Sequence, residues 1–365
     1  CYTYAEAVAA MGYSDDFAKY TLCEVMKAHF SLFNMAPIVL INVLDITKHK
    51  KSVEKHEVAV KEKAAVIVAP VLMESMKVFA DGSIETPLTK DTDYTAAHDD
   101  DGNVLITVLD GGSAKEATSL YVQYDEADST QVQASDIVGG VDINTGKAEG
   151  LELIDEIYPR FGLVPGIIIA PGFSDDTTVG AVMKAKTTNI CGHFRAIAVA
   201  DIPTETVITY TKASEWKNKN NYIDTSLIAC WPKLKLGDAV YHMSTQLASL
   251  INKVDSQNGD MPYHSPSNAS FQTDGAVLDD GTEIWLNSQN AAYLNGQGIV
   301  TALNFIGGWK AWGNRTTAYP SNTDVKDAFI PIRRMFNWVL NTLITSYWSK
   351  VDEPTNKRLI NTMVD

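Results

Sequence analysis

Short apolar runs alternate with helix-length segments along the second half of the chain, and this alternation is the strongest constraint on its fold. The runs are rich in branched residues and predict buried strands, and the segments between them have the spacing of amphipathic helices. The expected strands are 166–170, 194–200, 226–230 and 299–306, and the expected helices are 148–158, 175–185, 238–254 and 282–294. Strand, helix and strand in succession indicate a mainly parallel sheet with helices on its faces.

The first 70 residues are expected to belong to the same layered structure. Helices are predicted at 3–11 and 17–32, and Ser14 with two following aspartates has the pattern of an N-cap for the second helix. The continuous apolar run 37–44 indicates a strand buried on both faces. The alternating charges of 48–63 indicate a solvated connector instead.

The sequence between residues 71 and 145 has a different pattern. Short β-rich runs lie at 66–77, 104–109 and 119–124, and Asp-Gly or Gly-Gly pairs lie between or beside them. Such pairs favour hairpin turns because those turns need a positive φ. We therefore expect a mixed α/β chain: a discontinuous core domain formed by residues 1–70 and 146–365, with a small all-β domain of sandwich or barrel type inserted at 71–145.

Composition excludes two classes of partner. The formal charge is −15, from 30 Lys and Arg against 45 Asp and Glu, and the cations form no cluster. A nucleic-acid-binding surface needs clustered cations, so we expect no direct contact with nucleic acid. No run of about 20 apolar residues is present, so we expect no stable membrane insertion. The four cysteines are scattered without a C-x-x-C motif, which is typical of a reducing compartment.

The loops after the expected parallel strands, where α/β enzymes place their active sites, carry no complete catalytic motif. In P-G-F-S-D-D at 171–176, Asp176 stands where a nucleophile elbow needs glycine. Ser174 or Asp175 is expected to cap the next helix. Cys191 and His193 supply only half of a metal site, and no second pair has the spacing of zinc ligands.

Two other loops were candidates for chemistry. The glycines of 140–148 have the wrong spacing for a phosphate loop, and the same stretch lacks the final glutamate of a calcium loop. The loop 263–268 brings His264 close in sequence to two serines, so the competing hypothesis is an α/β hydrolase-like enzyme with a site near His264. A triad is assembled in space from distant segments, however. We expect no catalytic, cofactor-binding or metal-binding residue.

The glycine- and tryptophan-rich stretch 293–320 leaves two interpretations open. It contains Trp309 and Trp312, followed by Asn314, Arg315 and Thr316. Large aromatic rings beside an arginine are typical of a protein contact surface. The same tryptophans can equally complete a hydrophobic core.

A more specific pattern begins in this stretch and continues toward the end of the chain. Residues 308–316 (G-W-K-A-W-G-N-R-T) precede 329–335 (F-I-P-I-R-R-M), a long expected helix to about Tyr347, and the turn 352–356 (D-E-P-T-N). This order resembles the tail sheath proteins of contractile bacteriophages and phage-tail-like particles. In that family a G-x-x-x-W-G-x-R-T segment leads to an Arg-Arg helix and a Glu-Pro-Asn turn. Thr355 between Pro354 and Asn356 departs from the pattern.

The resemblance extends through most of the chain, including 4–17, 137–142 and 165–172. It implies a non-enzymatic structural subunit without a cofactor. Its partners would be other copies of itself, a tail tube protein, and the baseplate and tail terminator proteins. Its location would be the contractile tail of a virion assembled in the bacterial host cytoplasm, where contraction drives the tube through the cell envelope for genome ejection. A prophage-derived tailocin or contractile injection device would share these mechanics. Sheath proteins normally have an N-terminal arm and a C-terminal domain or arm, which we expect to lie outside this sequence.

The resemblance also supplies candidates for structural or intersubunit contacts. They are Trp309, Trp312, Asn314, Arg315, Thr316, Arg333, Arg334 and Glu353. The three arginines are expected to form ion pairs inside the chain, with the next subunit, or with the tube, and the sequence leaves these options open. The inserted β domain is expected to face outward.

Overall fold

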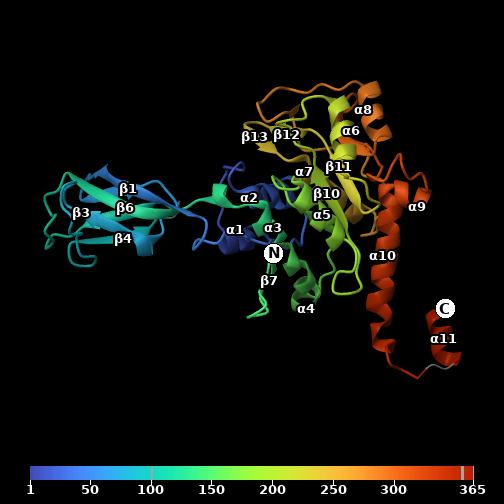
Figure 1. Ribbon diagram of the computed structural model, residues 1–365, viewed down its shortest axis with the longest axis horizontal. Helices are drawn as coiled ribbons and strands as arrows, with labels where there is room; N and C mark the ends of the chain where they lie inside the picture. The colour runs from blue at the N-terminus through green and yellow to red at the C-terminus, as the bar shows by residue number, and fades with distance from the viewer. Residues whose placement is uncertain (100–101, 355–356, 365) are drawn as a thin grey trace. The chain divides into compact units, whose positions relative to one another are not determined.

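The computed structural model describes residues 1–99, 102–354 and 357–364, and the chain divides into two compact units (Figure 1). The larger unit comprises Cys1–Val43 and Ala134–Asp365, and the smaller unit comprises Leu44–Gln133. The smaller unit therefore begins and ends earlier in the chain than the segment 71–145 that the sequence analysis assigned to an inserted domain.

A five-stranded sheet forms the centre of the larger unit, in the order β16-β15-β11-β10-β9 (Figure 1). Its strands are β9 (Ile167–Ile169), β10 (Ile197–Asp201), β11 (Leu227–Cys230), β15 (Ile299–Asn304) and β16 (Trp309–Trp312). The first four strands run parallel, and β16 pairs antiparallel with β15. The four parallel strands confirm the alternation in the sequence, and β16 is an additional edge strand.

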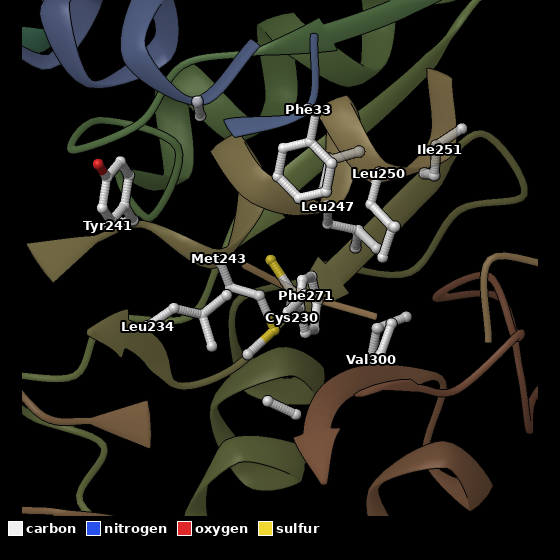
Figure 2. Close-up of a cluster of buried hydrophobic side chains, with 14 of the residues drawn as sticks. Phe33, Cys230, Leu234, Tyr241, Met243, Leu247, Leu250, Ile251, Phe271 and Val300 are labelled. Carbon is white, nitrogen blue, oxygen red and sulfur yellow. The ribbon is translucent and has the colours of Figure 1, made fainter. Parts of the chain in front are cut away.

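Helices cover both faces of this sheet because alternate residues of its strands face opposite sides. Ile197 and Val199 pack into one buried cluster with α7 (Met243–Gln257), and Ala198 and Ala200 pack into another with α5 (Thr177–Lys186). Figure 2 shows part of the first cluster, with Leu247 and Leu250 of α7 beside Phe33. Helices α6 (Tyr210–Lys219) and α8 (Ser288–Gly296) contribute Ala213 and Leu294 to a further buried cluster, which also contains Ala229 of β11 and Ile299 of β15.

The N-terminal residues differ from the expectation in two places. After α1 (Tyr4–Met11), the next helix, α2 (Thr21–Met26), begins later than expected because residues 16–20 form a separate turn, and it continues as a π-helix over Lys27–Leu32. The run 37–44 is not a strand. Its apolar side chains alternate between two clusters, with Leu40 in one and Val39 and Ile41 in the other, which explains their apolar character without sheet pairing.

Several small elements of the larger unit gave no clear signal in the sequence. One antiparallel sheet contains β12 (Lys233–Leu236), β13 (Ala239–Tyr241) and β14 (Gly275–Val277). A second antiparallel sheet contains β7 (Gly140–Val141) and β8 (Ala148–Glu149). The helix expected at 148–158 is a 3-10 helix over Gly150–Glu156, followed by α4 (Ile157–Phe161). Further helices are α3 (Ala134–Val138), α9 (Val325–Ala328), α10 (Ile330–Tyr347) and α11 (Lys357–Val364).

The smaller unit consists of two three-stranded antiparallel sheets around one apolar core. One sheet contains β1 (Lys50–Ala59), β6 (Ser119–Ala127) and β3 (Lys77–Phe79), and the other contains β2 (Ala64–Ile67), β5 (Val104–Val108) and β4 (Tyr94–His98). The expectation of a solvated connector at 48–63 is wrong for β1. Its charged residues pair across the strand with β6, as Lys50 does with Asp125 and Lys51 with Glu126.

The chain is thus a mixed α/β protein with a mainly parallel five-stranded sheet and several small antiparallel sheets. Among the helices that the structure describes, none combines the length and the apolar character needed to cross a bilayer.

Candidate functional site

The Trp-rich segment forms the edge strand β16 of the five-stranded sheet. Trp309 is buried and stacks at a tilt on Trp285, with ring centroids 5.5 Å apart. The outer edge of the strand exchanges backbone hydrogen bonds with residues 268–271. Trp312 is half-buried and lies opposite Thr301 of β15. Trp309 therefore completes a core, and the strand edge beside it is covered by the same chain.

Arg315 lies between two aromatic rings of its own chain. Its guanidinium carbon is 4.4 Å from the centroid of the Tyr319 ring and 3.7 Å from that of the Phe329 ring. A backbone bridge joins Arg315 to Phe329, and the Asn314 carbonyl accepts a hydrogen bond from the Ile330 amide. Cation–π contacts contribute about 0.5–2 kcal/mol each. Arg315 and Asn314 thus attach the segment after β16 to the beginning of α10.

Two buried threonines continue this attachment. The Thr316 hydroxyl donates to the Asp327 carbonyl at 2.6 Å. The Thr317 hydroxyl donates to the Asp224 carbonyl and accepts from the Asp224 amide, both at 3.0 Å. Each hydroxyl satisfies a backbone group that is removed from water, and leaving such a group unpaired would cost about 1–3 kcal/mol. Thr316 is therefore held by contacts within the chain.

A buried lysine lies beneath the same segment and was missed by the sequence analysis. The Lys217 ammonium, from α6, donates to the carbonyls of Thr317 and Tyr319, each at 3.0 Å. Burial lowers the pKa of Lys217 to about 8. Gly298 completes the packing, because a Cβ at this position would lie 2.6 Å from the carbonyl oxygens of Thr316 and Tyr319.

The Arg-Arg pair of α10 is bound within the chain at both positions. The Arg333 guanidinium lies 3.1 Å from the Asp327 carboxylate. Arg334 is more deeply buried and makes a two-pronged contact with Asp255 in the last turn of α7, with one N–O distance of 2.9 Å. A bidentate arginine–carboxylate pair fixes orientation as well as distance. It therefore fixes α10 against α7.

Glu353 is separate from this group. It is exposed, and its amide donates to the Lys350 carbonyl at 3.3 Å. Two residues of the D-E-P-T-N turn, Thr355 and Asn356, lie outside the described residues. The structure thus gathers Trp309, Trp312, Asn314, Arg315, Thr316, Arg333 and Arg334 around the junction of β16 and α10, and it leaves Glu353 beyond the end of α10.

The loop after β9 contains a helix cap that the sequence analysis placed incorrectly. Asp176 is the N-cap of α5, and its carboxylate accepts from the amides of Thr178 at 2.8 Å and Val179 at 3.1 Å. The Ser174 hydroxyl accepts the Asp201 amide instead, and burial raises the pKa of Asp175. The cap falls at Asp176 because residues 170–174 first form their own turn.

A buried polar network at the carboxyl end of β10 also escaped the sequence analysis. Asp201 accepts from the amide and the hydroxyl of Ser244, at 2.9 and 2.5 Å. Beside it, the fully buried Glu24 of α2 accepts from the His242 amide at 2.7 Å and contacts the His242 ring at 2.8 Å. Burial alone would lower the pKa of His242, but Glu24 reverses the shift and raises it. The network joins α2 to the start of α7.

The remaining chemical candidates have structural partners. The Cys191 thiol donates to the Asp155 carbonyl at 2.8 Å, and the His193 ring stacks on Trp348 with centroids 4.9 Å apart. His264 is exposed, and its ring nitrogen lies 3.0 Å from the Ser265 carbonyl oxygen. The Ser267 hydroxyl accepts the Gly313 amide. Within residues 1–99, 102–354 and 357–364, no three His, Cys, Asp or Glu side chains gather as a metal site requires.

Two curated relatives align with most of this chain, although no family model matches it. The tail sheath protein of Burkholderia phage BcepMu is 26% identical over 377 aligned positions, which cover 98% of this chain and 75% of the relative. A putative prophage major tail sheath protein of Pseudomonas aeruginosa (strain UCBPP-PA14) is 25% identical over 76% of this chain and 69% of the relative.

Solved structures that partly resemble this chain include two sheath proteins. The sheath complex of an extracellular contractile injection system in its contracted state is 22% identical, with a TM-score of 0.44 over 63% of this chain and 59% of that chain. The sheath tail protein of Desulfitobacterium hafniense is 9% identical, with a TM-score of 0.44 over 84% of this chain and 68% of that chain. This chain spans less than two thirds of the injection-system protein.

Both curated relatives are tail sheath proteins, and the alignment with the phage relative includes nearly every residue from the N-terminal helices to the Arg-Arg helix. It therefore includes the motifs 308–316 and 329–335, which the structure joins where Arg315 packs on the Phe329 ring and Arg333 pairs with Asp327. Such a junction is a structural feature and not a catalytic one. The chain belongs to the contractile tail sheath protein family, as a structural sheath subunit.

Proposed function

We propose that this chain polymerises with itself, as stacked rings or a helix, around an inner tail tube. After a trigger from the baseplate the sheath contracts and drives the tube through the target cell envelope, which permits genome ejection. The observation that carries the proposal is the alignment of 98% of the chain with a phage tail sheath protein. In the finished particle the chain is a component of the virion tail, and it is assembled in the bacterial host cytoplasm.

The physical requirements of this function are mechanical. Contacts between copies must be heterologous, because head-to-tail contacts that do not close generate an extended assembly. Contraction further requires interfaces with two discrete packings, so that a small gain in each subunit adds over many copies. The tightly bonded junction around Arg315 and Arg334 suits a body that moves as a rigid unit between two such packings.

The proposal includes specific partners and an arrangement of the two units. The partners are other copies of the chain, the tail tube protein, and the baseplate and tail terminator proteins. The all-β part, expected at 71–145 and compact over Leu44–Gln133, faces outward, where added bulk does not obstruct stacking. The core formed by residues 1–70 and 146–365 carries the contacts between copies.

Electron microscopy of the full-length protein tests self-assembly directly. We expect tubes or rings whose number rises with protein concentration, and tubes of uniform bore when the cognate tail tube protein is added. Monomers that persist at high concentration in the presence of the tube protein would contradict the proposal.

A tailocin or another contractile injection device is the alternative particle. The same subunit mechanics apply, and the Pseudomonas relative belongs to a prophage. The genes beside this one separate the two: capsid genes indicate an intact phage, whereas tail genes alone indicate a device without a genome.

A further inference from the structure

The helix α2 carries a single acidic residue, and that residue is fully buried. Glu24 is 0% exposed, and its neighbours Cys23, Val25 and Met26 are buried as well. Its carboxylate accepts a hydrogen bond from the His242 amide at 2.7 Å and lies 2.8 Å from Nδ1 of the His242 ring. A carboxylate removed from water in this way requires a cation or several hydrogen-bond donors beside it. The His242 ring is the group that supplies such a cation.

The His242 ring is placed so that it can exchange a proton without leaving the carboxylate. The residue is the N-cap of α7, and its side chain is 14% exposed, so part of the ring reaches water. The ring also packs on the backbone of the loop after β9, because an added Cβ at Gly172 would lie 3.8 Å from Nε2. Histidine is the side chain whose ordinary pKa lies nearest to neutral pH. The charge of this buried pair is therefore open to control by the solvent.

Further charged groups act on His242 from the surrounding elements. Asp175 lies in the loop after β9, Asp201 at the end of β10 and Lys233 in β12. Lys233 is already paired with Asp279. The His242 ring is thus surrounded by three carboxylates, that of α2 included, and by one lysine that has a carboxylate of its own. This arrangement favours the protonated ring.

Two groups of this cluster respond to pH in the same direction. Burial by itself lowers the pKa of His242, but the carboxylates of Glu24 and Asp201 outweigh burial and raise that pKa. Burial raises the pKa of Asp175, and Asp201 raises it further. A group whose pKa is raised by folding stabilises the folded chain less as the pH rises. For His242 this contribution is complete below the ordinary value of 6.5 and is lost as the pH passes the folded pKa.

Other titratable groups near α2 and α7 keep their charge state between pH 6 and pH 8.5. Burial lowers the pKa of His29, in the π-helix beside Ser249 of α7, to about 4. It raises the pKa of Tyr241 to about 12, and it also raises the pKa of the Cys23 and Cys230 thiols. All four side chains are therefore uncharged across this range.

We propose that the Glu24–His242 pair is a proton-controlled clamp, which holds the N-terminal helical segment (residues 1–33) on α7 while the His242 ring is charged and loosens when the ring loses its proton. Among the residues that the structure describes, Glu24 forms no other ion pair. A neutral ring leaves its carboxylate buried without a cation, and separation of α2 from α7 returns that carboxylate to water. Mild acid thus tightens the segment, and mild alkali frees it. The clamp acts within one chain and is independent of the proposed function.

Hydrogen exchange of the full chain, measured by mass spectrometry at pH 6.0 and pH 8.5, tests the clamp. After correction for intrinsic exchange rates, we expect the protection of the amides in residues 21–32 of wild type to fall at least fivefold between these pH values. In His242→Gln the titrating ring is absent, so this protection should be low at both values and change less than twofold. His264 is exposed in a separate loop, and His264→Gln should keep the wild-type change.

The same experiment separates the clamp from the amino terminus, which also lies in this segment. The Cys1 amino group donates to the Ile38 carbonyl at 2.8 Å, and His242→Gln leaves it in place. An equal loss of protection in wild type and His242→Gln would overturn the proposal and assign the pH dependence to another group. Unchanged protection of wild type from pH 6.0 to pH 8.5 would overturn it as well.

The proton itself can be followed by NMR in chains labelled with ¹³C in the histidine rings. The resonance that is missing from His242→Gln identifies His242. We expect its titration midpoint in wild type to lie above 6.5, and in Glu24→Gln to fall at least tenfold in proton affinity, because burial then opposes the charge with one carboxylate fewer. A wild-type midpoint at or below 6.5 would overturn the proposal even if Glu24→Gln does not fold.

Discussion

Arg334 is the residue on which the position of α10 depends most directly. Its guanidinium is 9% exposed and pairs with Asp255, which is 15% exposed. Removing one member of a buried ion pair leaves the other charge uncompensated, at a cost of about 3–5 kcal/mol. We expect Arg334→Ala to lower the free energy of unfolding by about 3 kcal/mol in urea titrations. All seven tryptophans lie in the larger unit, so their fluorescence reports its unfolding alone.

A matched control for Arg334 lies in α4. Arg160 pairs with Glu156, but its side chain is 64% exposed. Exposed pairs contribute about 0–1 kcal/mol because water and salt screen them. Arg160→Ala should therefore change the free energy of unfolding by less than about 1 kcal/mol. Equal losses of unfolding free energy in Arg334→Ala and Arg160→Ala would show that burial does not make the Arg334–Asp255 pair more stabilising than an exposed pair.

Lys217 gives the larger unit a pH dependence of predictable sign. Its pKa is about 8 in the folded chain, and an unfolded lysine titrates near about 10.4. Between these values the unfolded chain binds more protons, so the free energy of unfolding rises with pH. We expect the free energy of unfolding of wild type, relative to that of Lys217→Met, to increase from pH 8 to pH 10. Urea titrations at several pH values measure it.

The control for Lys217 is on the same helix. Lys219 is exposed at the end of α6, so Lys219→Met changes the charge by the same amount without altering a buried group. The difference in free energy of unfolding between Lys219→Met and wild type should stay constant over the same pH range. A constant difference for Lys217→Met as well would contradict the expected titration of a buried amine.

At the level of elements, the turn between α8 and β15 depends on glycine. Gly298 has a φ of 71°, and an added Cβ would lie 2.6 Å from two carbonyl oxygens. A left-handed conformation costs an alanine about 1–2 kcal/mol, and overpacking costs about 1–3 kcal/mol more. We therefore expect Gly298→Ala to lower the free energy of unfolding by about 2–5 kcal/mol. Tryptophan fluorescence in urea measures the loss.

Gly296 provides the comparison for this turn. It is the last residue of α8, its φ is not positive, and a Cβ there would meet no atom within 4 Å. Gly296→Ala should be neutral or slightly stabilising, because alanine loses less conformational entropy on folding. A cost at Gly296 similar to that at Gly298 would mean that the close carbonyl oxygens are not the cause.

The elements that the sequence predicted well are those whose pattern comes from burial alone. Strands β10, β11 and β15 are almost entirely buried and the edge strand β9 is partly buried, so each is rich in apolar residues. Strand β1 was missed because its side chains are largely exposed and their charges resemble those of a loop. The run 37–44 was misassigned for the opposite reason. Its side chains are apolar because they enter two clusters, although its backbone pairs with no strand.

The candidate site was predictable only in part, for a similar reason. Arg315 and Thr316 stand in a segment whose order of residues resembles a known family, so sequence reasoning found them. Lys217 and the Glu24–His242 pair depend on residues that are distant in sequence, and ionic side chains are normally exposed. Nothing in a single sequence distinguishes a buried lysine on a polar helix from a solvated one.

At the scale of the whole molecule, charge is distributed unevenly along the sequence. The chain has a net charge of −15, yet the 68 residues from 284 to 351 carry +4. A large net charge opposes association of identical copies. Self-association therefore has to overcome repulsion between acidic copies.

This balance predicts how self-assembly responds to salt. The Debye length falls from about 30 Å at 0.01 M to about 8 Å at 0.15 M, so salt screens repulsion between acidic copies but leaves an apolar contact intact. We expect the concentration at half-assembly to fall severalfold from 10 mM to 150 mM sodium chloride, measured by sedimentation velocity. Chloride is preferable to sulfate, which strengthens apolar association by itself. A rise in that concentration with salt would indicate that carboxylate–cation pairs, and not apolar contacts, dominate contact between copies.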